Sequence, residues 1–557
     1  MSAPATIPTR VSERAAFVFC LVVPLGFGVL ALVLGQDANW DLRNYHWYNA
    51  YAFLTGRLHT DFGASTPYNP ALDIPFYLAA SALPAKVFSF LLGTIHGLNY
   101  IALYFLGRAV LAPLPEPRRT WAAAAVALTG VIGGGHIGLV GTSFHDNVVS
   151  LAVIGAMVII ARAPAEIFLG VSQRTYVRVG LAGLLLGIGV GLKMPTITFA
   201  VGLCFAFLLV AGTFWRRMFL AFWFGIGILA GMGISYGFWM MHLWQDFQNP
   251  IYPYFNNVFH SPLGLQQANR DTSFVPGGVL DKLIFPLRFS LNSHVAGEIA
   301  FRDYRIVSAY LLLLATPLIL LARRMAAPGE SVAAPMVDGL AARYVIAAAA
   351  LSFAVWVPLF GIYRYIIPLE MLSPLVAVAL IALWPVPARL REQIAVAVLV
   401  FVTVTASHGD WVRLPAWTHK MVEVTAPPLP EGTMVIMVGL EPLSYVAPSL
   451  PPEVPILRLQ GYFMDPKDGD TGTNRLIRAR LEAHEGPIYL LSAAWDRNAV
   501  NTVLPQFNLA ADFSACGEVQ ANLQPPPAEE QKISLCPVTR TDATPPGPDQ
   551  AGAIAHP

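Results

Sequence analysis

The stretch Ala15–Gly35, AAFVFCLVVPLGFGVLALVLG, is followed after Gln36 by Asp37–Tyr48, DANWDLRNYHWY. The first part carries no charged residue and has the length, about 20 residues, that a helix rising about 1.5 Å per residue needs to cross hydrocarbon. The second part places Asp37 and Asp41 where this apolar run meets water. The sequence therefore predicts a membrane protein with carboxylates at the bilayer surface, within reach of a lipid head group.

Composition indicates the same class of protein. Of the 557 residues, 55% are hydrophobic and 12% are charged, and the mean hydropathy is +0.55. These values lie outside the usual balance of soluble domains. The formal net charge of +1 gives no reason to expect a nucleic-acid partner. Because no small-residue cleavage site precedes Asp37, we expect the first apolar run to remain as an anchor.

Hydropathy predicts an α-helical polytopic protein with about eleven transmembrane helices. Pairs of arginines assign loops to the cytoplasm, at Arg118–Arg119, Arg216–Arg217 and Arg323–Arg324. This places the N-terminus in the cytoplasm and the C-terminal region outside. The segment Pro70–Leu111 is counted as one crossing. It begins with a surface segment broken by Pro75 and Pro84, and one true span follows, because a second crossing would invert all later loops.

The chain is predicted to have three parts. Residues 1–407 form the membrane domain, residues 408–540 form a small extracytoplasmic α/β domain, and residues 541–557, rich in Pro, Ala and Gly, form a disordered tail. Met434–Val438 and Ile488–Leu491 are predicted strands, with an amphipathic helix between them at Arg475–His484. Cys516 and Cys536 either form a disulfide, as an oxidising compartment permits, or stay free.

Candidate functional residues lie at loop ends on the predicted outer side. Asp41 precedes a helical stretch that Gly56 should end, and it is either a reactive carboxylate or the N-cap of that helix. Lys193 and Arg364 each lie between two apolar runs, where a cation needs an anion or water. The other candidates for substrate binding are Tyr45, His145, Asp146, His294, Glu298, Arg302 and Arg305.

Some of these candidates have alternative interpretations. His145–Asp146 can bind substrate or help to hold a divalent cation, or Asp146 can cap the following span. Arg302 and Arg305, three residues apart, are expected to share a helix face and to grip phosphate oxygens, or else to form ion pairs or lipid contacts. The spacing of the carboxylates and histidines identifies no metal site, so the metal is left open.

The order of these features resembles that of GT-C glycosyltransferases. The features are an early acidic residue in the first outside loop, a tyrosine-containing helix ending in Gly56, and the turns Pro67-Tyr68-Asn69-Pro70, Gly191-Leu192-Lys193 and Arg364-Tyr365-Ile366-Ile367-Pro368. The resemblance covers about Val11 to Ser407. Asp41 matches the family's first-loop catalytic acid, with Asp37 as the alternate. Many members have two adjacent acidic residues there, whereas here Ala38-Asn39-Trp40 separates them.

The resemblance implies transfer of a sugar from a polyprenyl-phosphate donor to a glycan, lipid or protein acceptor. The reaction would take place on the extracytoplasmic face of a bacterial inner membrane, with inversion. Asp41 would accept the acceptor's proton, and Lys193 and Arg364, with Arg302 or Arg305, would stabilise the departing lipid phosphate. No cofactor is implied beyond a divalent cation in some members.

Other functions remain open from the sequence. An O-antigen ligase or polysaccharide polymerase would place its essential Arg and His in a later loop. A lipid or solute transporter would carry ionisable residues near the bilayer midplane and duplicated halves. A receptor or scaffold with a degenerate site is the third alternative.

Overall fold

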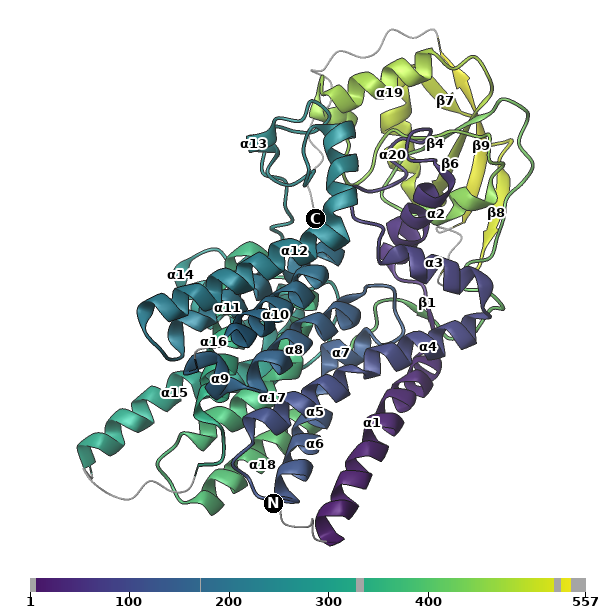
Figure 1. Cartoon of the computed structure of the whole chain (residues 1–557). Helices are drawn as coiled ribbons and strands as arrows, with labels where there is room; N and C mark the ends of the chain where they lie inside the picture. Colours follow the sequence, from purple (N-terminus) through teal and green to yellow (C-terminus); the bar gives the residue numbers. More distant parts are fainter. Residues whose placement is uncertain (1–6, 171, 327–334, 525–531, 542–557) are drawn as a thin grey trace. The chain divides into compact units, whose positions relative to one another are not determined.

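The computed structural model describes residues 7–170, 172–326, 335–524 and 532–541, which form two compact units (Figure 1). The helical unit comprises Met1–Leu34, Ser89–Phe238 and Asp271–Trp411. The sheet unit comprises Gly35–Phe88, Trp239–Arg270 and Val412–Pro557. The predicted disordered tail, apart from Thr541, lies outside the described residues.

The helical unit consists of helices joined by short turns. Its α-helices, two of which (α4 and α12) extend into the sheet unit's residues, are α1 (Ile7–Leu34), α4 (Ala85–Gly97), α5 (Asn99–Val110), α6 (Arg118–Val131), α7 (Gly134–Gly138), α8 (Asp146–Ala161), α9 (Pro164–Phe168), α10 (Gln173–Leu192), α11 (Ile197–Ala206), α12 (Phe214–Phe247), α14 (Val279–Leu291), α15 (Arg305–Ala326), α16 (Gly339–Leu359), α17 (Ile367–Ala382) and α18 (Ala388–Val404). Single 3-10 turns are η2 (Met194–Thr196), η3 (Phe207–Leu209), η4 (Ser293–Val295) and η5 (Tyr363–Ile366).

Among the described residues, seven helices are long and apolar enough to cross a membrane. They are Arg14–Leu34, Ala85–Val110, Gln173–Leu192, Phe214–Phe247, Arg305–Ala322, Gly339–Leu359 and Tyr363–Ala382. Two shorter apolar helices, Asp146–Ala161 and Met194–Leu209, lie between them in the sequence. The count of about eleven spans and their orientation stay predictions. Within Pro70–Leu111, only Ala85–Val110 has the length of a span, as expected for a single crossing.

Helix α17 forms the centre of the helical unit. Apart from Glu370 and Ser373 its side chains are apolar, and 94% of an 18-residue apolar stretch within Tyr363–Ala382 is buried. The helices that α17 contacts include α6, α15 and α16. Glycines permit close packing elsewhere in this unit. A Cβ at Gly183 or Gly187 of α10 would collide with backbone oxygens of Phe224 and Ile228 in α12, so these helices approach closely only because glycine has no side chain.

The sheet unit contains a mixed sheet in the order β3-β8-β9-β6-β4-β5, with β7 also paired to β9. Its strands are β3 (Val424–Thr425), β4 (Met434–Met437), β5 (Ile456–Arg458), β6 (Ile488–Ala493), β7 (Leu509–Ala511), β8 (Gly517–Ala521) and β9 (Ile533–Arg540). Strand β4 is parallel to β5 and β6, whereas β9 is antiparallel to its neighbours. Helices α19 (Gly472–Glu482) and α20 (Arg497–Val503) supply Ile477 and Val500 to a core with Ile436 and Leu490. The predicted strands and the helix between them are therefore confirmed.

Two earlier segments of the chain also belong to the sheet unit. Strand β1 (Gln36–Asp37) pairs antiparallel with β2 (Arg413–Leu414), and Phe62 pairs with Leu457 of β5. Their remaining elements are η1 (Leu42–His46), α2 (Trp47–Thr55), α3 (Asp73–Ala82) and α13 (Asn256–Phe259). The unit is thus assembled from three stretches, where the sequence suggested one beginning at 408. The backbone hydrogen bonds that join these stretches, such as that from the Phe62 N–H to the Ile456 carbonyl, link residues almost 400 positions apart.

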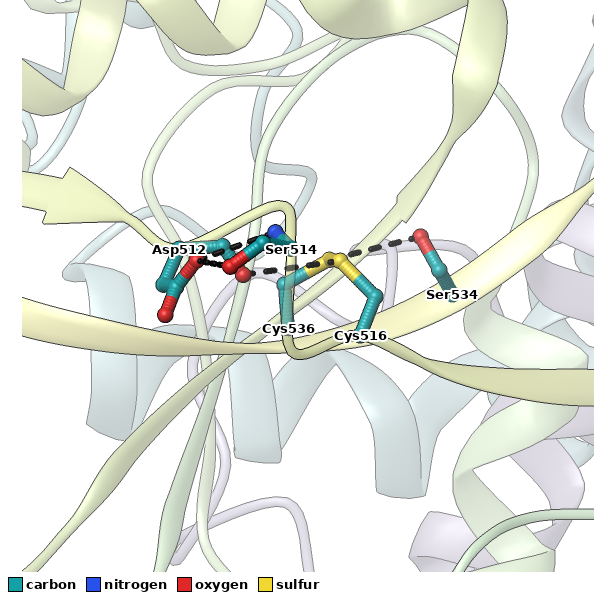
Figure 2. Close-up of a disulfide and its surroundings, with 5 residues drawn as sticks. All are labelled: Asp512, Ser514, Cys516, Ser534 and Cys536. Carbon is teal, nitrogen blue, oxygen red and sulfur yellow. Dashed lines mark hydrogen bonds between the residues drawn. A yellow bond between two sulfur atoms is a disulfide. The ribbon is translucent and has the colours of Figure 1, made fainter.

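Cys516 and Cys536 form a disulfide (Figure 2). Cys516 precedes β8, and Cys536 is buried in β9, the strand with which β8 pairs. In Figure 2 the bond lies beside a turn in which the Ser514 hydroxyl donates to Asp512 at 2.6 Å. The structure thereby decides between the two alternatives for these cysteines.

Candidate functional site

Asp41 lies immediately before η1, a π-helical turn that leads into α2. The helix ends as predicted at Gly56, whose φ of 74° is the left-handed conformation that glycine adopts without strain. Asp41 makes no side-chain cap bond; the Asn39 side chain instead accepts the Leu42 N–H at 2.8 Å. The half-buried Asp41 carboxylate accepts a hydrogen bond from the Tyr45 hydroxyl at 2.9 Å. The N-cap interpretation of Asp41 is therefore wrong.

Asp37 has a different environment. It belongs to β1 and is only 1% exposed. Its carboxylate accepts hydrogen bonds from the Asn39 backbone N–H at 3.2 Å and side-chain amide at 2.7 Å. Asp37 thus fixes the residue that caps η1, which favours Asp41 over Asp37 as the reactive carboxylate.

In the helical unit, Lys193 forms the end of α10 and contacts the start of α8. Its Nζ lies 2.8 Å from Oδ2 of Asp146, the first residue of α8, and donates to the Phe144 carbonyl. His145, which lies between Phe144 and Asp146 in the sequence, is buried, and its φ of 65° turns the chain into α8. The predicted residues His145, Asp146 and Lys193 therefore lie together, and the Asp146 carboxylate engages the lysine rather than a backbone cap.

Arg364 joins the same cluster from η5. Its guanidinium carbon lies 4.2 Å from the centre of the Phe144 ring and 5.8 Å from that of Tyr365. Lys193 Nζ also lies 5.8 Å from the Tyr365 ring centre. Two cations, Lys193 and Arg364, thus lie with the Asp146 carboxylate where α8 and α17 begin and α10 ends. We call Lys193, Arg364 and Asp146 the cation cluster; its ammonium and guanidinium groups are the kinds of donor that bind phosphate oxygens in proteins.

The helical unit also contains an apolar groove. Its volume is about 360 Å³, and helices α14, α15, α16 and α17 line it. Its wall includes Pro358 and Leu369, which flank η5 on either side in the sequence. A groove with this lining can accept a hydrocarbon chain.

The remaining predicted residues have other surroundings. His294 and Glu298 are exposed, and Arg302 is exposed with its Nε donating to the Thr405 carbonyl at 2.9 Å. Arg305 is 1% exposed, forms an ion pair with Asp303, and donates to the Thr129 carbonyl at 3.0 Å.

The expectation that Arg302 and Arg305 share a helix face is wrong. Helix α15 begins at Arg305, and Arg302 pairs through its backbone with Ser407. The ion-pair alternative holds for Arg305, since its guanidinium is used within the protein.

Sequence reasoning missed Glu370, a fully buried carboxylate in α17. It accepts hydrogen bonds from the backbone N–H groups of Gly135 and His136, each at 2.9 Å, and from the Tyr363 hydroxyl at 2.8 Å. Tyr363 is the neighbour of Arg364, so Glu370 anchors the turn that presents this cation. The signal was available, because a carboxylate inside an apolar span requires partners.

The possible divalent cation stays a prediction. In the sheet unit, His46 Nδ1 lies 2.6 Å from Asp73 Oδ1.

No family model and no curated protein matches the chain. Three solved structures of the Archaeoglobus fulgidus oligosaccharyltransferase AglB are similar to it in fold. The apo form has a TM-score of 0.43 and is 11% identical over 88% of this chain and 71% of the other. The form tethered to an acceptor peptide has a TM-score of 0.42 and is 12% identical over 86% of this chain and 69% of the other. The complex with an inhibitory peptide and dolichol-phosphate has 0.42 and 11% over 91% and 74%. Such values leave the chemistry to be inferred from this chain's own residues.

Proposed function

We propose that the protein is a membrane glycosyltransferase that moves a sugar from a polyprenyl-phosphate donor to a hydroxyl acceptor on the extracytoplasmic face. The observation that carries this proposal is that the helical unit holds both the cation cluster and an apolar groove lined by the helices on either side of η5 in the sequence. Lys193 and Arg364 come from different turns and meet at Tyr365. A phosphate attached to a long hydrocarbon chain is the ligand that matches a cationic end and an apolar groove.

The donor chemistry follows from this arrangement. As the bond between the anomeric carbon and the phosphate oxygen breaks, the electron pair goes to the lipid phosphate. Lys193 and Arg364 stabilise the added negative charge where it develops, which lowers the barrier more than it stabilises the bound donor. Arg364 offers several N–H donors in one plane, and Lys193 offers a compact charge.

Asp41 acts on the acceptor in this proposal. An acceptor hydroxyl is a weak nucleophile until a base takes its proton. Asp41 is a half-buried carboxylate that follows the first membrane-length helix in the sequence. The new bond forms on the face of the sugar opposite the phosphate, so the anomeric configuration inverts. The disulfide of the sheet unit fits a bacterial periplasm or another oxidising compartment.

The test is turnover by purified full-length protein in lipid nanodiscs, given radiolabelled polyprenyl-phosphate hexoses and pentoses. Release of polyprenyl phosphate with transfer of label is expected from the wild type. Asp41→Asn should lower the rate roughly 100-fold or more, whereas Asp470→Asn, an exposed carboxylate of the same unit, should not. Normal turnover by Asp41→Asn would reject the role of Asp41, and no turnover of any donor by the wild type would reject the reaction.

A further inference from the structure

Aromatic side chains gather around Asp41 within the sheet unit. They come from the first loop and from the segment after β5, and we call them the aromatic cluster: Trp40, Tyr45, Tyr68, Tyr462 and Phe463. Ring centres lie 6.1 Å apart for Trp40 and Tyr462, 5.1 Å for Tyr45 and Tyr68, and 5.8 Å for Tyr68 and Phe463. All three contacts are edge-to-face, a favourable geometry that fixes the rings relative to one another.

The segment that carries Tyr462 and Phe463 is a tight turn. The Gly461 N–H donates to the Met464 carbonyl at 2.9 Å, which closes the turn. Tyr462 is 61% exposed at its tip, and Trp40 is 36% exposed. A fixed turn that holds aromatic rings toward water has little conformational entropy to lose when a ligand binds.

A cavity of about 310 Å³ adjoins the aromatic cluster. Tyr462 and Phe463 line it, together with Asn44 from the π-helical turn that follows Asp41. Polar side chains line it too: His242 Nε2 lies 3.6 Å from Asp246 Oδ2, and Arg480 donates to the Thr60 carbonyl at 2.8 Å. The cavity therefore combines aromatic walls with amide, imidazole, carboxylate and guanidinium groups.

This combination favours a sugar over the other acceptor classes. The C–H faces of a pyranose ring pack on aromatic rings, and its hydroxyl groups pair with planar polar side chains. A lipid chain would place hydrocarbon against those polar groups, which is unfavourable. A peptide that added a strand at β5 would meet an occupied edge, because Phe62 donates to the Ile456 carbonyl at 2.8 Å and accepts from Arg458 at 2.9 Å.

We propose that this cavity and the aromatic cluster bind the acceptor of the reaction, and that the acceptor is a carbohydrate built of pyranose rings. The inference rests on the proposed function, since it assigns the site beside Asp41 to the acceptor. A hydroxyl of the bound sugar gives its proton to Asp41 while its oxygen forms the new bond to the donor's anomeric carbon. The bond to the lipid phosphate breaks, and the phosphate keeps the electron pair.

The experiment measures binding separately from turnover. Full-length Asp41→Asn protein in nanodiscs is applied to immobilised oligosaccharides of glucose, galactose, mannose and N-acetylglucosamine, and to immobilised peptides. The same measurement is made after adding Tyr462→Ala alone and Tyr462→Ala with Phe463→Ala. Phe255→Ala is the matched control, because Phe255 is an exposed aromatic residue of the same unit outside the cavity. Melting temperatures of all variants are recorded.

We expect binding of at least one pyranoside, weakened about tenfold by Tyr462→Ala and further by the double variant, with Phe255→Ala unchanged. Tyr462 is exposed, so its truncation should leave the melting temperature unchanged. Three results would overturn the inference: no binding of any oligosaccharide, binding that survives Tyr462→Ala at full strength, or binding of peptides alone. If pyranosides bind as expected but the wild type turns over no polyprenyl-phosphate sugar, the carbohydrate site stands and the proposed function falls.

Discussion

Lys193 Nζ lies 2.8 Å from Asp146 Oδ2, so that the end of α10 is tied to the start of α8 by an ion pair. The pair is only partly exposed, with 16% of the lysine side chain and 4% of the aspartate side chain accessible. The ion pair spares Lys193 the cost of being buried as an unpaired charge. It also holds Lys193 at Phe144, whose carbonyl accepts from the lysine and whose ring Arg364 contacts.

The first prediction concerns these cations. Lys193→Ala and Arg364→Ala should each lower kcat/KM for a polyprenyl-phosphate sugar by roughly 100-fold, because each removes a positive charge from the departing phosphate. Lys193→Arg should keep part of the activity. Steady-state rates in nanodiscs check this, with Arg174→Ala as control, since Arg174 is exposed near the opposite end of α10. Unchanged kcat/KM in both alanine variants would contradict the donor site.

The second prediction concerns Glu370. Glu370→Ala leaves the N–H groups of Gly135 and His136 without their acceptor and should destabilise the helical unit by roughly 2 kcal/mol. Activity should also fall, because the Tyr363 bond that anchors the Arg364 turn is lost. Thermal unfolding and turnover are measured together, and Tyr363→Phe, which removes one of the bonds, should have a smaller effect on both.

An independent substitution tests the same anchor. A Cβ at Gly133 would collide with the Glu370 carboxylate, so Gly133→Ala should reproduce the loss of stability. Gly225→Ala is the control, because a Cβ at that helical glycine has open space. If Glu370→Ala and Gly133→Ala melted at the same temperature as the wild type, the Glu370 anchor would contribute nothing to stability.

Local signals in the sequence were sufficient for much of the fold. Long apolar runs located helices of the helical unit, short apolar runs located β4 and β6, and Gly56 marked the end of α2. Lys193 and Arg364 were recognisable because a cation between two apolar runs has to find a partner, and the structure shows both beside Tyr365. These inferences needed only neighbouring residues.

The rest depended on residues far apart in the chain. Glu370 accepts from a backbone group 235 positions away, and no side-chain pattern reports a backbone N–H. For Arg305 the sequence left phosphate binding and an ion pair open, and the structure shows its guanidinium engaged by Asp303 and by the carbonyls of Thr129 and Ile132. The sheet unit recruits Phe62 by pairing it with β5, and a single sequence carries no sign of that register.

The third prediction separates Asp37 from Asp41. Asp37→Asn should lower the melting temperature, because the Asp37 carboxylate accepts from Asn39, whose side chain caps η1. A weaker acceptor at position 37 should reduce the free energy of unfolding by about 1 kcal/mol. Asp41→Asn should leave the melting temperature unchanged and lower turnover, since Asp41 is half-buried and its amide can still accept from Tyr45. The opposite pattern would transfer the role of base to Asp37.

The fourth prediction concerns the disulfide. Cys516 and Cys536 are 20 residues apart, and closing a loop of that size restricts the unfolded chain by about 3 kcal/mol in the loop-entropy model. Cys516→Ser with Cys536→Ser should therefore lower the stability of the sheet unit by about that amount. Dithiothreitol should destabilise the wild type equally and the double variant not at all. Cys204→Ser, at a free cysteine of α11, should keep the response to dithiothreitol. A wild type whose disulfide is fully reduced, as shown by thiol labelling, yet melts as before would mean that β8 and β9 stay paired without the bond.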